Sequence, residues 1–199
     1  ASKKAAEVAP SQSTPSTTTQ DVVGAWNALS ALNDFDANLK VRVGTLVQDG
    51  KTLKNLGLDG TLYAGALTLR SLQLGDYQGA SANLSGTFNG FGAIPEMSKV
   101  KITAKAQNAQ RLAADFGATG LPKGLKAVAL NATAEGSLLK PRFDARLSAL
   151  EGTFGAKGSF AVLPIAFGFD GSISANHPDF GALLKTLDLG FNPAGPLGA

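Results

Sequence analysis

Residues that could do acid–base chemistry are few in this chain of 199 residues, which has one histidine and no cysteine. His177 stands in the run Asn-His-Pro-Asp, where helix capping or turn formation is favoured over base catalysis. The lack of cysteine excludes disulfides and thiolate metal sites. No spacing suggests a Ca²⁺ loop or a zinc site, and no phosphate-binding glycine motif is present. We therefore expect neither a metal site nor a cofactor.

Four carboxylates are the remaining candidates for catalysis. Asp36, Asp59, Asp144 and Asp170 all fall at polar positions of expected β-strands. Carboxylates in such positions are typically solvated, and a catalytic pair would need two of them on adjacent strands. The sequence does not establish which strands are adjacent. We predict that the protein is not an enzyme.

The elements that must position these residues are β-strands. In the run FDANLKVRV, apolar residues alternate strictly with polar ones over residues 35–43, which gives a strand with one apolar and one polar face. Short breaks at Gln48-Asp49-Gly50, Ala64-Gly65 and Gly75-Asp76 predict antiparallel neighbours. The expected strands span residues 35–43, 54–63, 66–74, 78–88, 99–106, 127–135, 142–150, 153–161 and 165–174.

Two short helices are expected, each directly after a strand. The first covers residues 108–117, with Asn108 as its cap and Gly117 at its end. The second covers residues 178–189, with Asn176 or His177 as its cap and Pro178 in its first turn. The matching places of Asn108 and Asn176 indicate a weak internal repeat.

The beginning of the chain differs in composition from the rest. Residues 1–20 are rich in Ser, Thr, Pro and Ala, which predicts a flexible linker before a domain of residues 21–199. From Asp21 the spacing favours a short helix, whose Trp26 is read as a lid on the first strand rather than as a binding aromatic. The final run, Asn-Pro-Ala-Gly-Pro, suggests a fragment of a longer protein.

The formal net charge of +3 comes from basic residues scattered along the expected strands. Because almost no aromatic residues lie among them, a solvated sheet face is favoured over a nucleic-acid-binding patch, and no nucleic-acid partner is expected. No apolar run approaches the ~20 residues that cross a bilayer. The scattered basic residues include Lys40, Arg42, Lys99, Lys101, Arg142 and Arg146.

The fold class that follows is mainly β with short helices: a curved antiparallel sheet of eight or nine strands that forms an apolar groove of repeating type. Such a sheet has an apolar face of roughly 1,000 Å², of which two short helices cover roughly 300 Å². A face left open on that scale normally marks an interaction site. The alternative is a sheet that folds over into a sandwich or closes into a barrel and buries the face. The predicted groove lining is Val41, Leu58, Ile102, Leu130, Leu147, Phe167 and Phe169.

Three stretches carry a resemblance to a known family. The first is Trp26, Leu29 and Leu32 followed by FDANLKVRVGTLVQDGKTLKNLGLDGTLYAGALTLRSLQLGDYQGASANLSGTF. The others are LKPRFDARLSALEGTFGAKGSFAVLP and NHPDFGALLKTLDLGFNPAG. In hydrophobic spacing and glycine placement, residues 22–199 resemble the C-terminal region of the AsmA family of Gram-negative envelope proteins.

The resemblance implies a periplasmic module attached to the inner membrane by a segment outside this sequence. It also implies further repeats of the same chain and a role in outer-membrane biogenesis, with phospholipid or another acyl-chain lipid held in a β-groove. The alternative function is a structural or assembly scaffold of the cell envelope that buries its own apolar face and binds no ligand.

Overall fold

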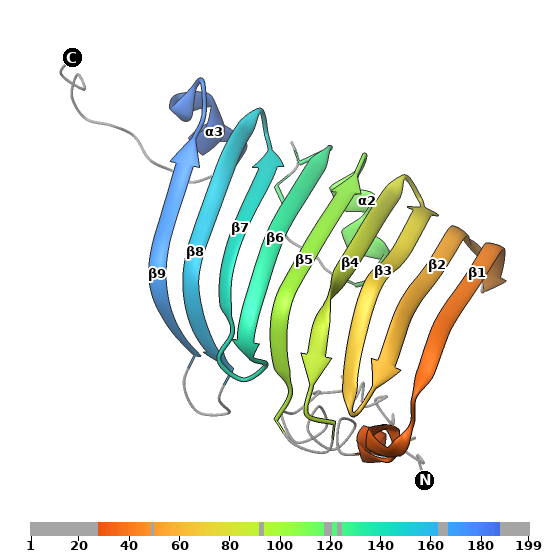
Figure 1. Cartoon of the computed structure of the whole chain (residues 1–199). Helices are drawn as coiled ribbons and strands as arrows, with labels where there is room; N and C mark the ends of the chain where they lie inside the picture. The colour runs from red at the N-terminus through yellow and green to blue at the C-terminus, as the bar shows by residue number, and fades with distance from the viewer. Residues whose placement is uncertain are drawn as a thin grey trace, which may run out of the picture.

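The computed structural model describes residues 28–48, 50–91, 94–117, 121–122, 125–162 and 167–187. Nine strands lie side by side in a single layer, in the same order as in the sequence, and every neighbouring pair is antiparallel (Figure 1). The strands are β1 (Ala37–Gln48), β2 (Lys51–Tyr63), β3 (Ala66–Tyr77), β4 (Ala80–Asn89), β5 (Glu96–Ala106), β6 (Val128–Ser137), β7 (Arg142–Ala149), β8 (Gly152–Val162) and β9 (Phe167–Asn176).

The prediction of an antiparallel sheet of eight or nine strands is confirmed, with nine. The turn at Ala64-Gly65 is also confirmed, since both residues have the positive φ, 47° and 71°, of a tight hairpin turn. The predicted turn at Gly75-Asp76 is wrong, because β3 continues to Tyr77 and the turn lies at Gln78-Gly79, with φ of 54° and 79°. The register shifts between Leu74 and Tyr77, so the predicted break is a bulge within the strand.

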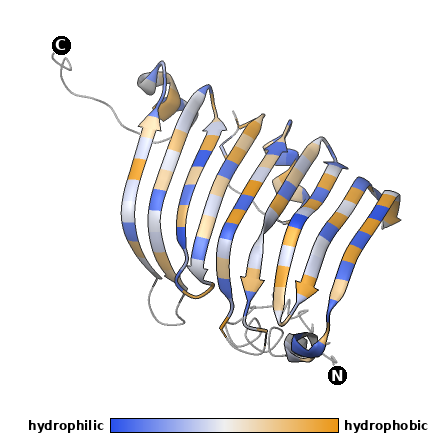
Figure 2. Ribbon diagram, in the orientation of Figure 1, coloured by the Kyte–Doolittle hydropathy of each residue, from blue (hydrophilic) through white to orange (hydrophobic). Residues whose placement is uncertain are grey.

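The register separates the sheet into two chemically different faces. Side chains directly opposite one another across a ladder share a face, so one row can be followed through all nine strands. The alternation that builds these rows is visible in Figure 2. The central apolar row is Val41, Leu58, Leu72, Leu84, Ile102, Ala132, Ala145, Ala156 and Ile173. The next row, on the other face, is Arg42, Gly57, Gln73, Asn83, Thr103, Asn131, Arg146, Gly155 and Ser174. We call these the apolar face and the polar face.

Helix α2 (Ala109–Asp115) follows β5, as predicted. The side chain of Asn108 caps it by accepting a hydrogen bond from the Arg111 N–H at 2.9 Å. Gly117 ends the turn after the helix with φ of 73°, a conformation that glycine adopts without steric cost. Both predicted ends of this helix are therefore confirmed.

Helix α3 (Phe180–Thr186) follows β9, but its predicted cap is wrong. Asp179 is the cap and accepts a hydrogen bond from the Ala182 N–H at 2.9 Å. Asn176 is still paired with Thr153 as the last residue of β9, so its backbone belongs to the ladder and not to a helix start. Pro178 consequently precedes the cap. The proposed equivalence of Asn108 and Asn176 as caps does not hold.

Helix α2 covers one end of the apolar face and lies behind the sheet in Figure 1. The Tyr77 hydroxyl donates to Asp115 at 3.3 Å, and the rings of Tyr77 and Phe116 have centroids 6.1 Å apart. Leu183 of α3 is buried at the same end. We call this the helix end of the sheet.

The opposite end, which we call the loop end, is closed by the 3-10 helix η1 (Ala28–Asp34) and by the β4–β5 connection. The Asn33 amide donates to the Phe91 carbonyl at 2.7 Å, which ties the two segments together. Leu62, Phe91 and Met97 are buried there. The predicted linker, residues 1–20, and the predicted helix with Trp26 lie outside the described residues.

The sheet is open: β1 and β9 are its two edges and do not pair with each other. The alternative prediction of a sandwich or a closed barrel is therefore wrong for the described strands. The strands are bowed along their length (Figure 1). Register shifts occur in each ladder from β2 to β6, where bulges increase twist and bending.

Candidate apolar binding surface

The residues predicted to line a groove lie on one face of the sheet. Val41, Leu58 and Ile102 belong to the central apolar row, on β1, β2 and β5. Leu130 and Leu147 are opposite each other in the adjacent apolar row, on β6 and β7. Phe169 of β9 is opposite Phe160 of β8, and the Phe167 backbone pairs with Val162 on the same face. The side chain of Phe167 lies outside what the structure describes.

The middle of the apolar face is uncovered in the described part of the chain. Val41 is 50% exposed, Leu72 is 43% exposed and Ile173 is 76% exposed, although all three belong to the central row. Phe169 is also exposed. Exposed apolar side chains therefore lie on β1, β3, β7, β8 and β9, and half-buried ones on the strands between them complete a band across the sheet.

Side-chain size varies along this band in a regular way. The central row has large residues from β1 to β5 and then alanines on β6, β7 and β8. The adjacent row has alanines on β4 and β5 and then Leu130, Leu147 and Phe154. The small residues of the two rows therefore join into one shallow path that large side chains border. The adjacent row is Val43, Leu56, Leu74, Ala82, Ala104, Leu130, Leu147, Phe154 and Ala175.

Three phenylalanines border the alanine path on the side toward the loop end. The ring centroids of Phe143 and Phe160 are 5.4 Å apart in an edge-on arrangement, and those of Phe143 and Phe169 are 6.1 Å apart. Such ring pairs are favourable beyond their burial alone. The predicted groove lining includes Phe169 but not Phe143 or Phe160, although alternation within residues 142–150 and 153–161 puts both on the apolar side of their strands. The sequence does not give the strand register, and it is the register of β7, β8 and β9 that brings the three phenylalanine rings together.

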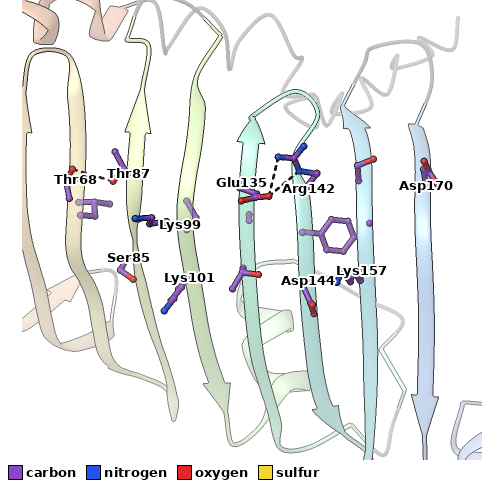
Figure 3. Close-up of a pocket in the computed structure, with 18 residues that line it drawn as sticks. Thr68, Ser85, Thr87, Lys99, Lys101, Glu135, Arg142, Asp144, Lys157 and Asp170 are labelled. Carbon is purple, nitrogen blue, oxygen red and sulfur yellow. Dashed lines mark hydrogen bonds and ion pairs between the residues drawn. The ribbon is translucent and has the colours of Figure 1, made fainter.

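The polar face contains a hollow of about 960 Å³ that extends from β3 to β9 in the half of the sheet toward the loop end (Figure 3). Glu135 accepts a hydrogen bond from the Arg142 guanidinium at 3.2 Å, and the two form an exposed ion pair. Cations and carboxylates alternate around the hollow, so it suits water and ions better than an apolar ligand. Its charged residues are Lys99, Lys101, Glu135, Arg142, Asp144, Lys157 and Asp170.

The candidate catalytic carboxylates do not assemble into a pair. Asp36 accepts a hydrogen bond from the Ala64 N–H at 3.0 Å and so supports a hairpin turn. Asp59 forms an ion pair with Arg70. Asp144 on β7 and Asp170 on β9 are separated by β8. Among the described residues, no group of three or more metal-ligating side chains could hold a metal ion.

His177 has a structural position, as expected from its sequence context. Its Nε2 is 2.6 Å from the Leu150 carbonyl, and its Nδ1 accepts a hydrogen bond from the Asp179 N–H at 3.0 Å. These partners require the neutral ring with its proton on Nε2. The ring thus connects the start of α3 to the β7–β8 turn and has both nitrogens occupied.

No described helix is both long enough and apolar enough to span a membrane. Comparison of the chain with models of known families, with curated proteins and with solved structures finds no match.

Proposed function

We propose that the protein binds the acyl chains of phospholipid, or of another lipid with long chains, on its apolar face. The observation that carries this proposal is the apolar band that runs through all nine strands, with exposed side chains on β1, β3, β7, β8 and β9 and half-buried ones between them. Patches of this extent are rare on soluble proteins unless they bind something. In this proposal the band is the floor of the predicted groove.

Acyl chains fit this surface better than other apolar ligands. The alanine path is narrow, is continuous across several strands and is bordered by leucines and phenylalanines. A flexible chain can follow such a path, and its charged headgroup can stay in water at the edge of the face. A chain of about twelve methylenes, half-sheltered, gains about 5 kcal/mol, which is enough for weak and reversible binding.

We also propose a cellular role for this lipid binding. The resemblance of residues 22–199 to the AsmA family supports a periplasmic lipid-transfer module that serves outer-membrane biogenesis. In that setting a segment beyond this sequence holds the protein at the inner membrane, and further repeats of the same chain extend the groove.

Dependence of affinity on chain length tests the proposal. A fluorescent fatty acid is bound to the protein and displaced by single-chain lipids with one headgroup and tails of about eight to sixteen carbons. Each added methylene should strengthen binding by about twofold to fourfold, since burying a methylene contributes up to about 0.8 kcal/mol. Affinities that do not change with tail length, or no saturable binding, would support the scaffold function instead.

A further inference from the structure

Strand β9 is an edge of the sheet with the features of a pairing site. Among the described strands it has a neighbour on one side only, so one row of backbone N–H and C=O groups is free to bond another strand. It is ten residues long, and residues 168–176 are all exposed. Phe169 and Ile173 are 47% and 76% exposed, and both would be covered by one more strand.

The usual protections of an edge strand are missing from β9. Natural edges are commonly blunted by bulges, prolines, lysines or short length. The ladders from β6 to β9 contain no register shift, whereas every ladder from β2 to β6 does. The strand has no proline, and Asp170 is its only charged residue. The regular half of the sheet thus ends in a straight ladder that can be continued.

We propose that β9 pairs with β9 of a second copy of the chain, antiparallel, about a two-fold axis at Gly171. Two nine-stranded sheets then become one continuous sheet, and the apolar face runs through both copies. This inference goes beyond lipid binding and does not depend on it. It requires that the further repeats proposed above join the sheet at β1 and not at β9.

The sequence of β9 is complementary to itself in this register. With Gly171 opposite its own copy, Phe169 faces Ile173 of the second copy, so the two exposed apolar side chains cover each other twice. On the polar face Asp170 faces Ser172 of the second copy, so no like charges meet. Centring the pair on Asp170 instead would place two carboxylates opposite each other, which is unfavourable.

Edge strand β9 is a better site for pairing with a second copy than β1, the other edge of the sheet. Strand β1 presents Lys40 and Arg42 on its polar face, so two copies joined there would bring four cations together. Helix α3 is placed toward the interior of the sheet and not beyond the β9 edge, because Leu183 lines the same hollow as Lys126 and Leu150 of the β7–β8 turn. A second copy can therefore approach the free edge.

A pair of substitutions at one exposed position tests the dimer. Sedimentation velocity of the full chain over a wide concentration range should show a reversible monomer–dimer equilibrium. Ser172→Asp places a new carboxylate opposite Asp170 of the second copy at two symmetric positions, and should raise the dimer Kd about tenfold. Ser172→Lys makes two opposite-charge pairs and should lower the Kd by a similar factor.

Each substitution should change the stability of the monomer in the direction opposite to its effect on the dimer. A change in dimer affinity can therefore be told apart from unfolding. Within one chain Ser172 is opposite Lys157, so the aspartate adds an attractive pair and the lysine adds a repulsive one. A weaker dimer of Ser172→Asp therefore cannot arise from unfolding. A wild-type protein that stays monomeric would overturn the proposal. Slow exchange of the β9 amides in such a monomer would show that its own chain covers the edge. If both substitutions raise the dimer Kd, the proposed register with Gly171 at the two-fold axis is wrong.

Discussion

Replacing Leu130 with aspartate is expected to reduce acyl-chain affinity by at least about tenfold, because the new carboxylate lies in the floor of the proposed groove. Leu130 is half-buried in β6, opposite Ala104 on one side and Leu147 on the other. A chain on the alanine path would pass beside it and would have to desolvate the charge. The measurement is a titration of wild type and variant with the same fluorescent fatty acid.

The adjacent residue in the same strand provides the matched control. Asn131→Asp adds the same carboxylate on the polar face, opposite Thr103 and Arg146, and should change affinity by less than about twofold. Circular dichroism and thermal unfolding establish that both variants are folded. Equal lipid binding by the two folded variants would rule out the apolar face as the binding site.

Gly158→Ala should have the largest effect on stability, a loss of about 3 kcal/mol or more. Gly158 of β8 is opposite Gly171 of β9 and has φ of 158°. A Cβ at this position would lie 2.6 Å from the Gly171 Cα and would collide with the Asp170 carbonyl oxygen. The backbones of β8 and β9 would have to separate, which disrupts packing and ladder bonds together. Urea unfolding measures the change.

Gly168→Ala in β9 is the control for this prediction. A Cβ there meets nothing within 4 Å, and the residue does not have a positive φ. The substitution should leave the free energy of unfolding within about 1 kcal/mol of wild type, or raise it slightly by restricting the unfolded chain. Equal effects of the two alanine substitutions would show that the close approach at Gly158 does not matter.

Much of the fold could be predicted because its signals are local. Strict alternation in runs such as residues 35–43 fixes both the strand and its apolar face. Short breaks such as Ala64-Gly65 permit only antiparallel neighbours, and repeating that rule gives strands in sequence order. The cap at Asn108 is equally local, since its side chain reaches an N–H three residues away.

The errors occur where tertiary pairing overrides a local signal. Gly75-Asp76 has turn residues, but their backbone lies within the β3 ladders, and the chain reverses at Gln78-Gly79 instead. Asn176 is a good cap residue, but pairing with Thr153 keeps it in β9, and Asp179 becomes the first residue free to cap. The ladder bonds decide both positions, and they depend on a strand distant in sequence.

The sequence predicts which face of the sheet each residue of the candidate site belongs to, but not which residues are neighbours across the strands. The sequence indicates that Leu130 and Leu147 each point to an apolar side, but only the register shows that they are opposite each other. The same holds for Phe143 and Phe160, whose rings meet across one ladder. A bulge in any intervening strand shifts the rows, and the bulges between β2 and β6 have no clear sequence signal.

Native mass spectrometry of protein purified without detergent tests the central claim most directly. If the apolar face holds acyl chains, the folded protein should carry bound lipid of discrete mass, and Leu130→Asp should carry much less than Asn131→Asp. A lipid-free mass for folded wild type, which stays lipid-free after incubation with phospholipid vesicles, would contradict the account.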